Sequence, residues 1–156
     1  MDLFDDEIVL FFRCLFKQQV KFIIVGGLAV NYHGFNRSTG DIDVWLDDTK
    51  ENRSKFVQAV KDYGIDGADL LMNMPFIAGY TELMLDNGLI IDLMSDMKFF
   101  KKENFNECHS QSRKFILLED IELSILNINH LISEKENSIR IKDIQDAEEL
   151  KRLYRK

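Results

Sequence analysis

Cysteine and proline are scarce in this sequence, and long hydrophobic runs are absent. Its 156 residues include two cysteines, too few for a disulfide framework or a zinc site. The single proline and the lack of any low-complexity stretch give no sign of a linker between domains. No apolar run reaches the roughly 18 residues that a membrane-spanning helix needs. We therefore expect one folded domain that does not enter a membrane.

Positive charge is also in short supply. The chain has 20 lysines and arginines against 27 aspartates and glutamates, which gives a net charge of −7. This surplus of negative charge argues against broad, sequence-independent binding of nucleic acid. The first residues, Met1 to Glu7, are acidic as well, whereas a secretory signal begins with basic residues. A cytoplasmic location is therefore expected.

What the sequence does contain is typical of a globular protein with strands and helices. Hydrophobic residues make up 46% and aromatic residues 11%, enough for a core in a chain of this length. Short apolar or alternating runs predict strands over 22–25, 41–46, 81–85, 89–93 and 115–118. Apolar residues at helical spacing predict helices over 8–16, 28–34 and 52–63.

The end of the chain predicts further helices. The segment 121–133 fits a short strand followed by a helix that begins near Asn129, an acceptable N-cap residue. The last helix would carry an apolar stripe formed by Ile141, Ile144, Ala147, Leu150 and Tyr154. Because strands and helices alternate, and one strand pair surrounds a hairpin turn at 86–88, the expected fold is α/β (α+β): a mixed β-sheet flanked by helices. We expect a single domain, with its core at about 20–97 and a helical part at about 129–156.

A glycine pair and an aspartate pair carry most of the information about function. Gly26 and Gly27 follow the first predicted strand, where glycines let backbone N–H groups approach a phosphate at a helix start. Asp41 and Asp43 open the next strand, and alternate residues of a strand share a face. Their carboxylates would lie roughly 6–7 Å apart, an unfavourable arrangement unless a cation lies between them. This pattern indicates metal-dependent phosphoryl or nucleotidyl transfer.

The residues around the aspartate pair extend the pattern. If the approach to the strand is extended, Arg37 and Thr39 share a face with the two aspartates. A guanidinium and a hydroxyl would then lie beside a metal-bound phosphate. A site with two divalent ions needs further oxygen ligands, and Asp92, in the strand after the hairpin, fits best as the third carboxylate. Asp41, Asp43 and Asp92 are therefore the candidate ligands for Mg²⁺ or Mn²⁺, and Asp92 can also accept the proton of an attacking hydroxyl.

The run from Gly26 to Asp43 has the pattern Gly-Gly-x-Ala … His-Gly-x-x-Arg-x-Thr-x-Asp-Ile-Asp. It resembles the nucleotidyltransferase superfamily with the polymerase-β-like fold, and the match is best to the bacterial branch of AbiEii-type toxins and related small domains. The family signature is a Gly-Gly or Gly-Ser turn, an acid-x-acid pair and a later acid on a strand. It matches Gly26, Gly27, Asp41, Asp43 and Asp92 here. The likeness covers about the first 100 residues well and the last 30 loosely.

The resemblance implies an enzyme that transfers an NMP group from an NTP, with ATP the favoured donor, to a hydroxyl or phosphate acceptor. The acceptor would be a small molecule, an RNA or a protein, and a homodimer or a partner subunit would complete so small a site. The branch also tends to carry a lysine, an arginine and an aspartate near the C-terminus, to which Lys135, Arg140 and Asp143 are similar. The residues expected to bind the nucleotide are Gly26, Gly27, Arg37, Thr39 and Lys135.

Several of these residues have simpler explanations. Gly27 stands where many active members carry a serine that contacts the triphosphate, so turnover does not follow from the motif alone. Lys135 lies between two glutamates and fits a solvated helix lysine equally well. Arg140 and Asp143 can pair with each other on a helix surface. Trp45, close to the aspartate pair, fits a core residue better than one that stacks on a base.

Two other functions remain open. A domain of the same fold without turnover would bind a nucleotide or a protein partner, as in one half of a toxin–antitoxin pair, and Gly27 and the small size of the chain favour this hypothesis. A metal-dependent phosphatase with an aspartyl nucleophile also has Asp-x-Asp at a strand end. That pair normally lies on the first strand and precedes a small or hydroxyl residue. Here it lies on the second predicted strand and precedes Val44 and Trp45, so we rank the phosphatase last.

Overall fold

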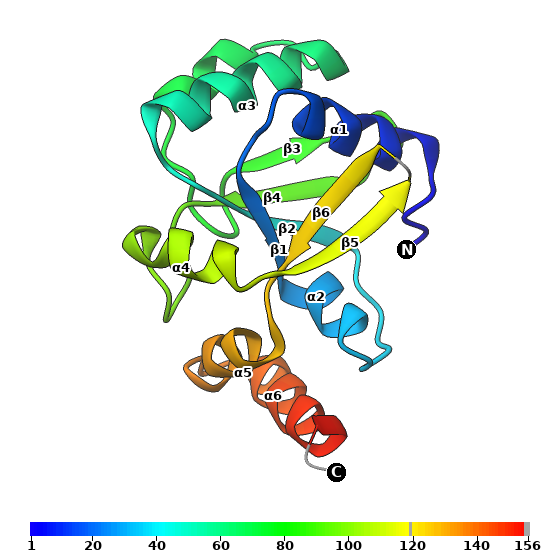
Figure 1. Ribbon diagram of the computed structural model, residues 1–156, viewed down its shortest axis with the longest axis vertical. Helices are drawn as coiled ribbons and strands as arrows, with labels where there is room; N and C mark the ends of the chain where they lie inside the picture. Colours follow the sequence, from blue (N-terminus) through cyan, green and yellow to red (C-terminus); the bar gives the residue numbers. More distant parts are fainter. Residues whose placement is uncertain (119, 155–156) are drawn as a thin grey trace.

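A mixed sheet of six strands runs through the computed structural model, which describes residues 1–118 and 120–154 (Figure 1). The strand order in the sheet is β3-β4-β2-β1-β6-β5. The strands are β1 (Phe22–Val25), β2 (Asp41–Leu46), β3 (Glu82–Met84), β4 (Ile90–Met94), β5 (Arg113–Leu118) and β6 (Ile121–Ile125). The predicted α/β fold class, a mixed sheet flanked by helices, is confirmed.

The centre of the sheet consists of the strands that precede the glycine pair and contain the aspartate pair. Strand β1 is antiparallel to β2 and parallel to β6, and β2 is parallel to β4. All four residues of β1 are buried, which explains its continuous apolar sequence, because a strand covered on both faces has no solvent side. Strands β3 and β4 form the predicted hairpin. The end of β1 therefore lies beside the start of β2, where Val25 pairs with Asp43.

Helices surround the sheet on both sides. They are α1 (Asp6–Lys17), α2 (Gly26–Tyr32), α3 (Lys50–Tyr63), α4 (Phe105–Ser110), α5 (Ile128–Glu136), α6 (Ile141–Tyr154) and two short 3₁₀ helices, η1 (Ala68–Met72) and η2 (Lys102–Asn104). Helices α1 and α3 pack against each other at one end of the molecule, whereas α5 and α6 pair at the other end, near the C-terminus (Figure 1). In the described ranges, no helix is both long enough and apolar enough to cross a membrane.

Capping residues explain where the helices begin and end. Thr49 caps α3 by accepting a hydrogen bond from the Asn52 N–H, so the helix starts two residues before the predicted position. Gly64 ends α3 in a left-handed conformation with φ of 110°, as its sequence position suggested. The prediction that Asn129 caps α5 was wrong. Asn127 is the cap, and its Oδ1 accepts from the His130 N–H at 2.7 Å.

Helix α4 was not predicted, and it explains the position of Trp45. The indole is fully buried and packs edge-to-face on Phe105 of α4, with ring centroids 5.2 Å apart. Its N–H donates to the Ser95 carbonyl at 2.7 Å, which satisfies the polar end of the ring. The interpretation of Trp45 as a core residue is confirmed.

The predicted apolar stripe of α6 is only partly buried. Ala147 and Leu150 lie in the core, but Ile141 and Ile144 are 73% and 41% exposed, and Tyr154 is also exposed. The buried face of the helix carries Asp143 and Asp146 in their place. Burial of two carboxylates requires partners of opposite charge. Helix α6 is therefore attached to the rest of the molecule through ion pairs as well as through apolar contacts.

Candidate functional site

The strand order brings two of the predicted acids together. Asp43 on β2 and Asp92 on β4 are direct partners in the parallel register of these strands. Asp43 is also the register partner of Val25, after which Gly26 begins α2. Three separate parts of the sequence thus meet beside strands β1, β2 and β4: the glycine turn, the aspartate pair and the strand after the hairpin turn. Asp41 lies at the exposed start of β2.

The two adjacent acids perturb each other. Burial, together with the nearby Asp92 carboxylate, raises the pKa of Asp43 to about 6. Burial also raises the pKa of Asp92, against the opposing effect of the Gly79 N–H, which donates to its two oxygens at 3.0 and 3.1 Å. Two like charges held this close favour either a proton or a metal ion between them.

Gly26 is required for this arrangement. Its φ is +64°, which side chains rarely adopt, and a Cβ placed on it would lie 1.9 Å from Oδ2 of Asp43. The Asp43 carboxylate therefore lies directly against the backbone at the start of α2. No other residue type at position 26 leaves Asp43 in its present place.

Thr39 and Arg37, which the sequence pattern also predicted to bind the nucleotide, lie against Gly27. A Cβ at position 27 would lie 2.7 Å from the Thr39 hydroxyl oxygen and 3.2 Å from an Arg37 nitrogen. The space that a serine side chain would need is therefore already filled. This contact gives a physical reason for glycine at the position where the resemblance calls for serine.

Arg37 and Thr39 do not lie in the cavity beside the carboxylates. The segment 35–40 forms no strand, so the alternation that begins at Asp41 does not extend back to them. The Arg37 guanidinium pairs with Asp146 of α6, with Nε 2.8 Å from Oδ1 and Nη2 2.9 Å from Oδ2. The structure thus gives Arg37 a role in attaching α6 to the loop before β2.

A cavity of about 660 Å³ opens beside Asp43 and Asp92 and extends to α5. This volume lies in the usual range of small-molecule sites, roughly 300–1,000 Å³. Gly26 and the two acids line one part of it. Four basic side chains also line the cavity, together with three further acids: Lys98, Lys101, Lys135 and Arg140, and Asp96, Glu134 and Asp143. Carboxylates and cations in one cavity match a ligand that brings both a metal ion and phosphates.

Lys135 is a buried residue, so the alternative explanation as a solvated helix lysine is wrong, whereas its binding of a nucleotide stays a prediction. It is 8% exposed, and its Nζ lies 2.9 Å from Asp143 and 3.0 Å from Asp146. Burial opposes the charge of Asp143, but hydrogen bonds from Ser138 and Lys135 outweigh it and hold the pKa of Asp143 below its usual value. The predicted surface pair of Arg140 with Asp143 is replaced by these buried contacts, and Arg140 precedes α6.

Lys98 and Lys101 were missed by the sequence analysis. Glu134 of α5 accepts hydrogen bonds from the backbone N–H groups of Lys98, Phe99 and Phe100, which fixes this turn against the helix. Both lysines thereby come to line the cavity. No short motif marks them. The available signal was their position a few residues after the strand that carries Asp92.

The two carboxylates suit a metal ion whose remaining ligands come from a bound substrate and water. In residues 1–118 and 120–154, no group of three or more acidic, histidine or cysteine side chains is arranged to hold a metal ion. Asp43 and Asp92 supply two adjacent carboxylates. Mg²⁺ is typically bound by one or two carboxylates together with substrate phosphates and water. The donor set therefore suits Mg²⁺ or Mn²⁺ whose remaining ligands are phosphate oxygens and water, and Asp41 lies nearby at the start of β2.

Comparison with known proteins does not assign the chain to a family. No family model matches the sequence, and no curated protein is significantly similar to it.

Proposed function

We propose that this protein is a metal-dependent nucleotidyltransferase that moves an NMP group from an NTP, ATP first among the candidates, to a hydroxyl or phosphate acceptor. The observation that carries the proposal is the cavity in which Asp43 and Asp92 lie together with four basic side chains. Nucleotidyl transfer needs this combination, because carboxylates hold the metal while cations bind the triphosphate. The same arrangement supports the resemblance to the polymerase-β-like superfamily.

The roles of the residues follow from their places in the cavity. Asp43 and Asp92, with Asp41 beside them, would hold Mg²⁺ or Mn²⁺, which supplies charge neutralisation and orientation of the phosphates when bound. Lys98, Lys101 and Arg140 would bind the phosphates. Lys135 lines the same cavity, is already paired with two aspartates, and would contact a phosphate from the cavity wall.

Asp92 would also act as the base in the proposed reaction. It takes the proton of the acceptor hydroxyl, the oxygen of that hydroxyl forms a bond to the α-phosphorus, and the bond from phosphorus to the bridging oxygen breaks to release pyrophosphate. The acceptor would be a small molecule, an RNA or a protein in the cytoplasm. A second copy of the chain or a partner subunit would provide the remaining acceptor surface.

A second candidate is a nucleotide-binding module without turnover, for example within a toxin–antitoxin pair. The packing of Thr39 and Arg37 around Gly27 favours it, since no hydroxyl at position 27 is available to contact a triphosphate. The two candidates share the binding site and differ in catalysis. Binding without transfer of label to any acceptor would support the module.

Calorimetric titration of each NTP, with and without Mg²⁺, tests the proposal. We expect metal-dependent binding to the wild type and a loss of at least about tenfold in affinity for Asp43→Asn and Asp92→Asn. Asp66→Asn is the matched control, because it makes the same change at an exposed site. Transfer of labelled nucleotide is then measured with RNA, protein and small-molecule acceptors. Equal NTP affinity in the wild type and both cavity variants would contradict the proposal.

A further inference from the structure

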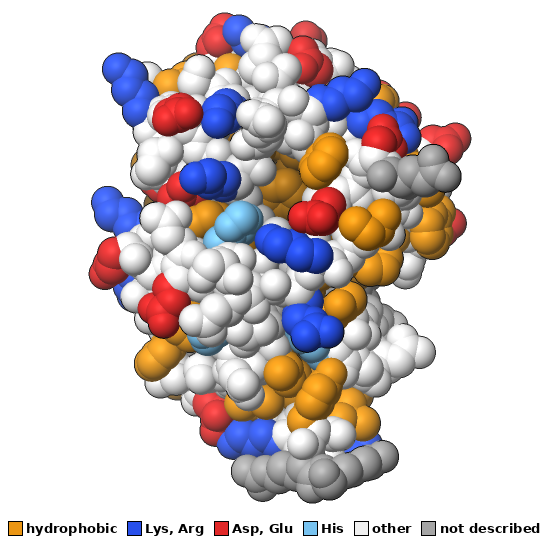
Figure 2. All heavy atoms as spheres, viewed as in Figure 1, with side chains coloured by type: hydrophobic (Ala, Val, Ile, Leu, Met, Phe, Trp, Pro, Cys, Tyr) orange, Lys and Arg blue, Asp and Glu red, His pale blue; other side chains and the backbone are white. Residues whose placement is uncertain are grey.

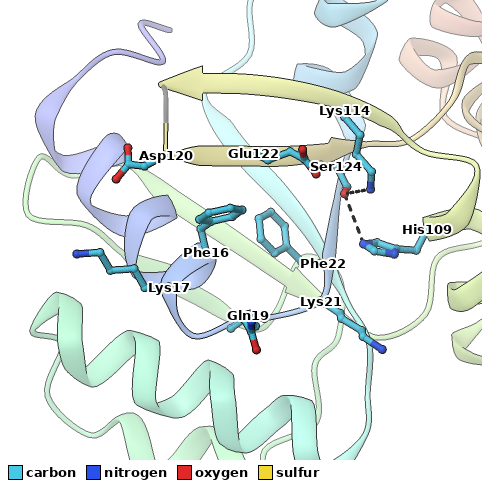
Figure 3. A pocket seen from close by; sticks show the side chains of 11 residues that line it. Phe16, Lys17, Gln19, Lys21, Phe22, His109, Lys114, Asp120, Glu122 and Ser124 are labelled. Carbon is cyan, nitrogen blue, oxygen red and sulfur yellow. Dashed lines mark hydrogen bonds between the residues drawn. The ribbon is translucent and has the colours of Figure 1, made fainter.

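A second pocket lies between the end of α1, strand β6 and helix α4 (Figure 3). Its volume is about 520 Å³. It shares no lining residue with the cavity beside Asp43, so the proposed nucleotide site does not account for it. Its polar groups come from three elements that are distant in the sequence, which makes it a feature of the fold.

Lys114 on β5 brings a positive charge to this pocket. Its Nζ donates to the Ser124 hydroxyl at 2.7 Å and to the Ser112 hydroxyl at 3.1 Å. An ammonium group has three N–H donors, so one remains for a ligand. Within the described part of the chain, Lys114 forms no ion pair. Its charge is therefore held in place by neutral hydroxyls and is not neutralised.

Lys21 adds to the positive potential of the pocket, and His109 lies close to Lys114 and Ser124. His109 of α4 points toward Ser124, with its Nε2 3.4 Å from the hydroxyl oxygen (Figure 3). Its ring stacks on Phe105, which fixes its orientation. Burial and the charges of Lys114 and Lys21 lower the pKa of His109, so both lysines act on the same point. An anion beside Ser124 would be attracted by both and would accept hydrogen bonds from Lys114 and the hydroxyl.

Acidic side chains limit the size of an anion that this pocket can hold. On the face seen in Figure 2, basic, acidic and hydrophobic side chains are interspersed, and no broad field of one sign develops. Glu122 lines the pocket beside Ser124, and Asp120, at the α1 end, pairs with Arg13 at 3.1 Å. A long polyanion would meet these carboxylates. A ligand with one phosphate group brings a single anionic group to Lys114, and hydroxyl groups on the rest of that ligand can donate hydrogen bonds to Glu122.

The remaining walls suit the uncharged part of such a ligand. The rings of Phe16 and Phe22 line the pocket next to the polar groups, and Phe16 is 42% exposed (Figure 3). Gln19 lies at the rim with φ of 57°. This left-handed conformation ends α1, because the N–H groups of Gln19 and Val20 donate to the Phe16 and Leu15 carbonyls at 3.0 and 3.1 Å.

We propose that this pocket is a second ligand site, which binds a phosphate monoester of a small polyhydroxylated molecule such as a sugar phosphate. Lys114 and Ser124 bind the phosphate, and Lys21 adds positive charge at the pocket wall. Glu122 accepts hydrogen bonds from hydroxyl groups, and Phe16 supports the carbon skeleton. The site is independent of the proposed nucleotidyl transfer and stands even if that function is absent.

Titration with ribose 5-phosphate and with inorganic phosphate tests the site. Calorimetry measures the affinity, and NMR of the backbone amides and the histidine rings shows where the ligand binds. We expect ribose 5-phosphate to bind more tightly than phosphate and to shift the signals of Lys114, Ser124 and His109. Lys114→Gln should weaken binding about tenfold and Ser124→Ala about threefold. Lys50→Gln, the same change at an exposed residue of α3, should leave affinity unchanged.

Lys98→Gln separates this pocket from the nucleotide cavity. It should retain ribose 5-phosphate binding, because Lys98 lines only the other cavity. The proposal is overturned if wild-type protein shows no shifts at Lys114 and Ser124, or if Lys98→Gln loses binding while Lys114→Gln retains it. Binding of a short oligonucleotide without binding of either small phosphate would also overturn it. Melting curves of each variant establish that the fold is retained.

Discussion

Two pairs of aspartates lie close to one cavity, but they differ in their partners. Asp143 and Asp146 on α6 are buried and lie 2.9 and 3.0 Å from the Lys135 ammonium. Asp43 and Asp92 face each other across β2 and β4, and the contact that stabilises Asp92 is a backbone N–H. The first pair is therefore neutralised by the protein. The second pair forms no ion pair in the described part of the chain, and the charge of Lys135 only partly offsets the effects that raise the pKa of Asp43.

The pKa values of the two pairs show the consequence. Hydrogen bonds from Ser138 and Lys135 overcome the effect of burial and lower the pKa of Asp143, whereas burial and Asp92 raise the pKa of Asp43 to about 6. Neutralised acids stabilise the fold, and acids left without a cation destabilise it until a ligand supplies one. Burial alone does not distinguish structural from functional acids, but the charge of their neighbours does.

The largest effect is expected when the neutralised pair is broken. Asp146→Asn leaves the buried Lys135 and the half-buried Arg37 with one carboxylate fewer, which costs about 3–5 kcal/mol in the free energy of unfolding. Urea denaturation at pH 7 measures this change. Glu148→Gln, at an exposed position of the same helix, should change the unfolding free energy by less than about 0.5 kcal/mol. A cost for Asp146→Asn as small as that of the control would show that the ion pairs do not hold α6.

A somewhat smaller loss of stability is expected at Gly26, where the Asp43 carboxylate lies against the backbone. Gly26→Ala places a methyl group 1.9 Å from Oδ2 of Asp43 at a φ of +64°, and should cost about 3 kcal/mol. In the background of Asp43→Ala the same change should cost about 1 kcal/mol, because only the backbone strain remains. Gly40→Ala is the control, since a Cβ there meets no atom within 4 Å. Additive costs in the double variant would contradict the contact with Asp43.

Removing the uncompensated charge should stabilise the protein without ligand. The pKa of Asp43 is raised to about 6 in the folded state, so the folded state binds the proton more tightly than the unfolded chain does. The resulting penalty is absent well below the unfolded pKa, grows as the pH rises, and is complete above about 6. Asp43→Asn should therefore increase the free energy of unfolding by about 3 kcal/mol at pH 7.5 and by only about 0.5 kcal/mol at pH 4.

Urea denaturation at both pH values measures this difference, with Asp66→Asn as the control at an exposed position. The same variant should lose metal-dependent NTP binding, so stability and binding change in opposite directions. A destabilising effect of Asp43→Asn at pH 7.5 would mean that the carboxylate is already compensated within the protein.

The comparison also shows which parts of the site the sequence could reveal. Asp43 and Asp92 were found because strand alternation and a hairpin turn are local signals, and both strands lie where predicted. The role of Arg37 was not found in this way. Its partner, Asp146, lies more than a hundred residues later and faces inward from a helix whose apolar positions suggested a different buried face.

Tertiary contacts decide the remaining features for the same reason. Lys98 and Lys101 reach the cavity because Glu134 of α5 accepts hydrogen bonds from the backbone of the turn that begins at Lys98. Neither the sequence of this turn nor that of α5 indicates this contact. The boundaries of α3 and α5 shifted by two residues where Thr49 and Asn127 proved to be the caps. Local periodicity predicts elements well, whereas pairs of charges between distant elements cannot be inferred from it.

The smallest change in the free energy of unfolding is expected at Gly27. This residue lies between the start of α2 and the loop whose Arg37 pairs with Asp146. Gly27→Ser brings a Cβ to 2.7 Å from the Thr39 hydroxyl oxygen, and Thr39 can move by rotating its side chain, so the cost should be about 1 kcal/mol. Thr39→Ala should remove most of this cost in the double variant. If Gly27→Ser with Thr39→Ala also binds NTP more tightly than Thr39→Ala alone, the serine hydroxyl reaches the triphosphate. Unchanged affinity would place the triphosphate away from position 27, with the basic side chains of the cavity as its main partners.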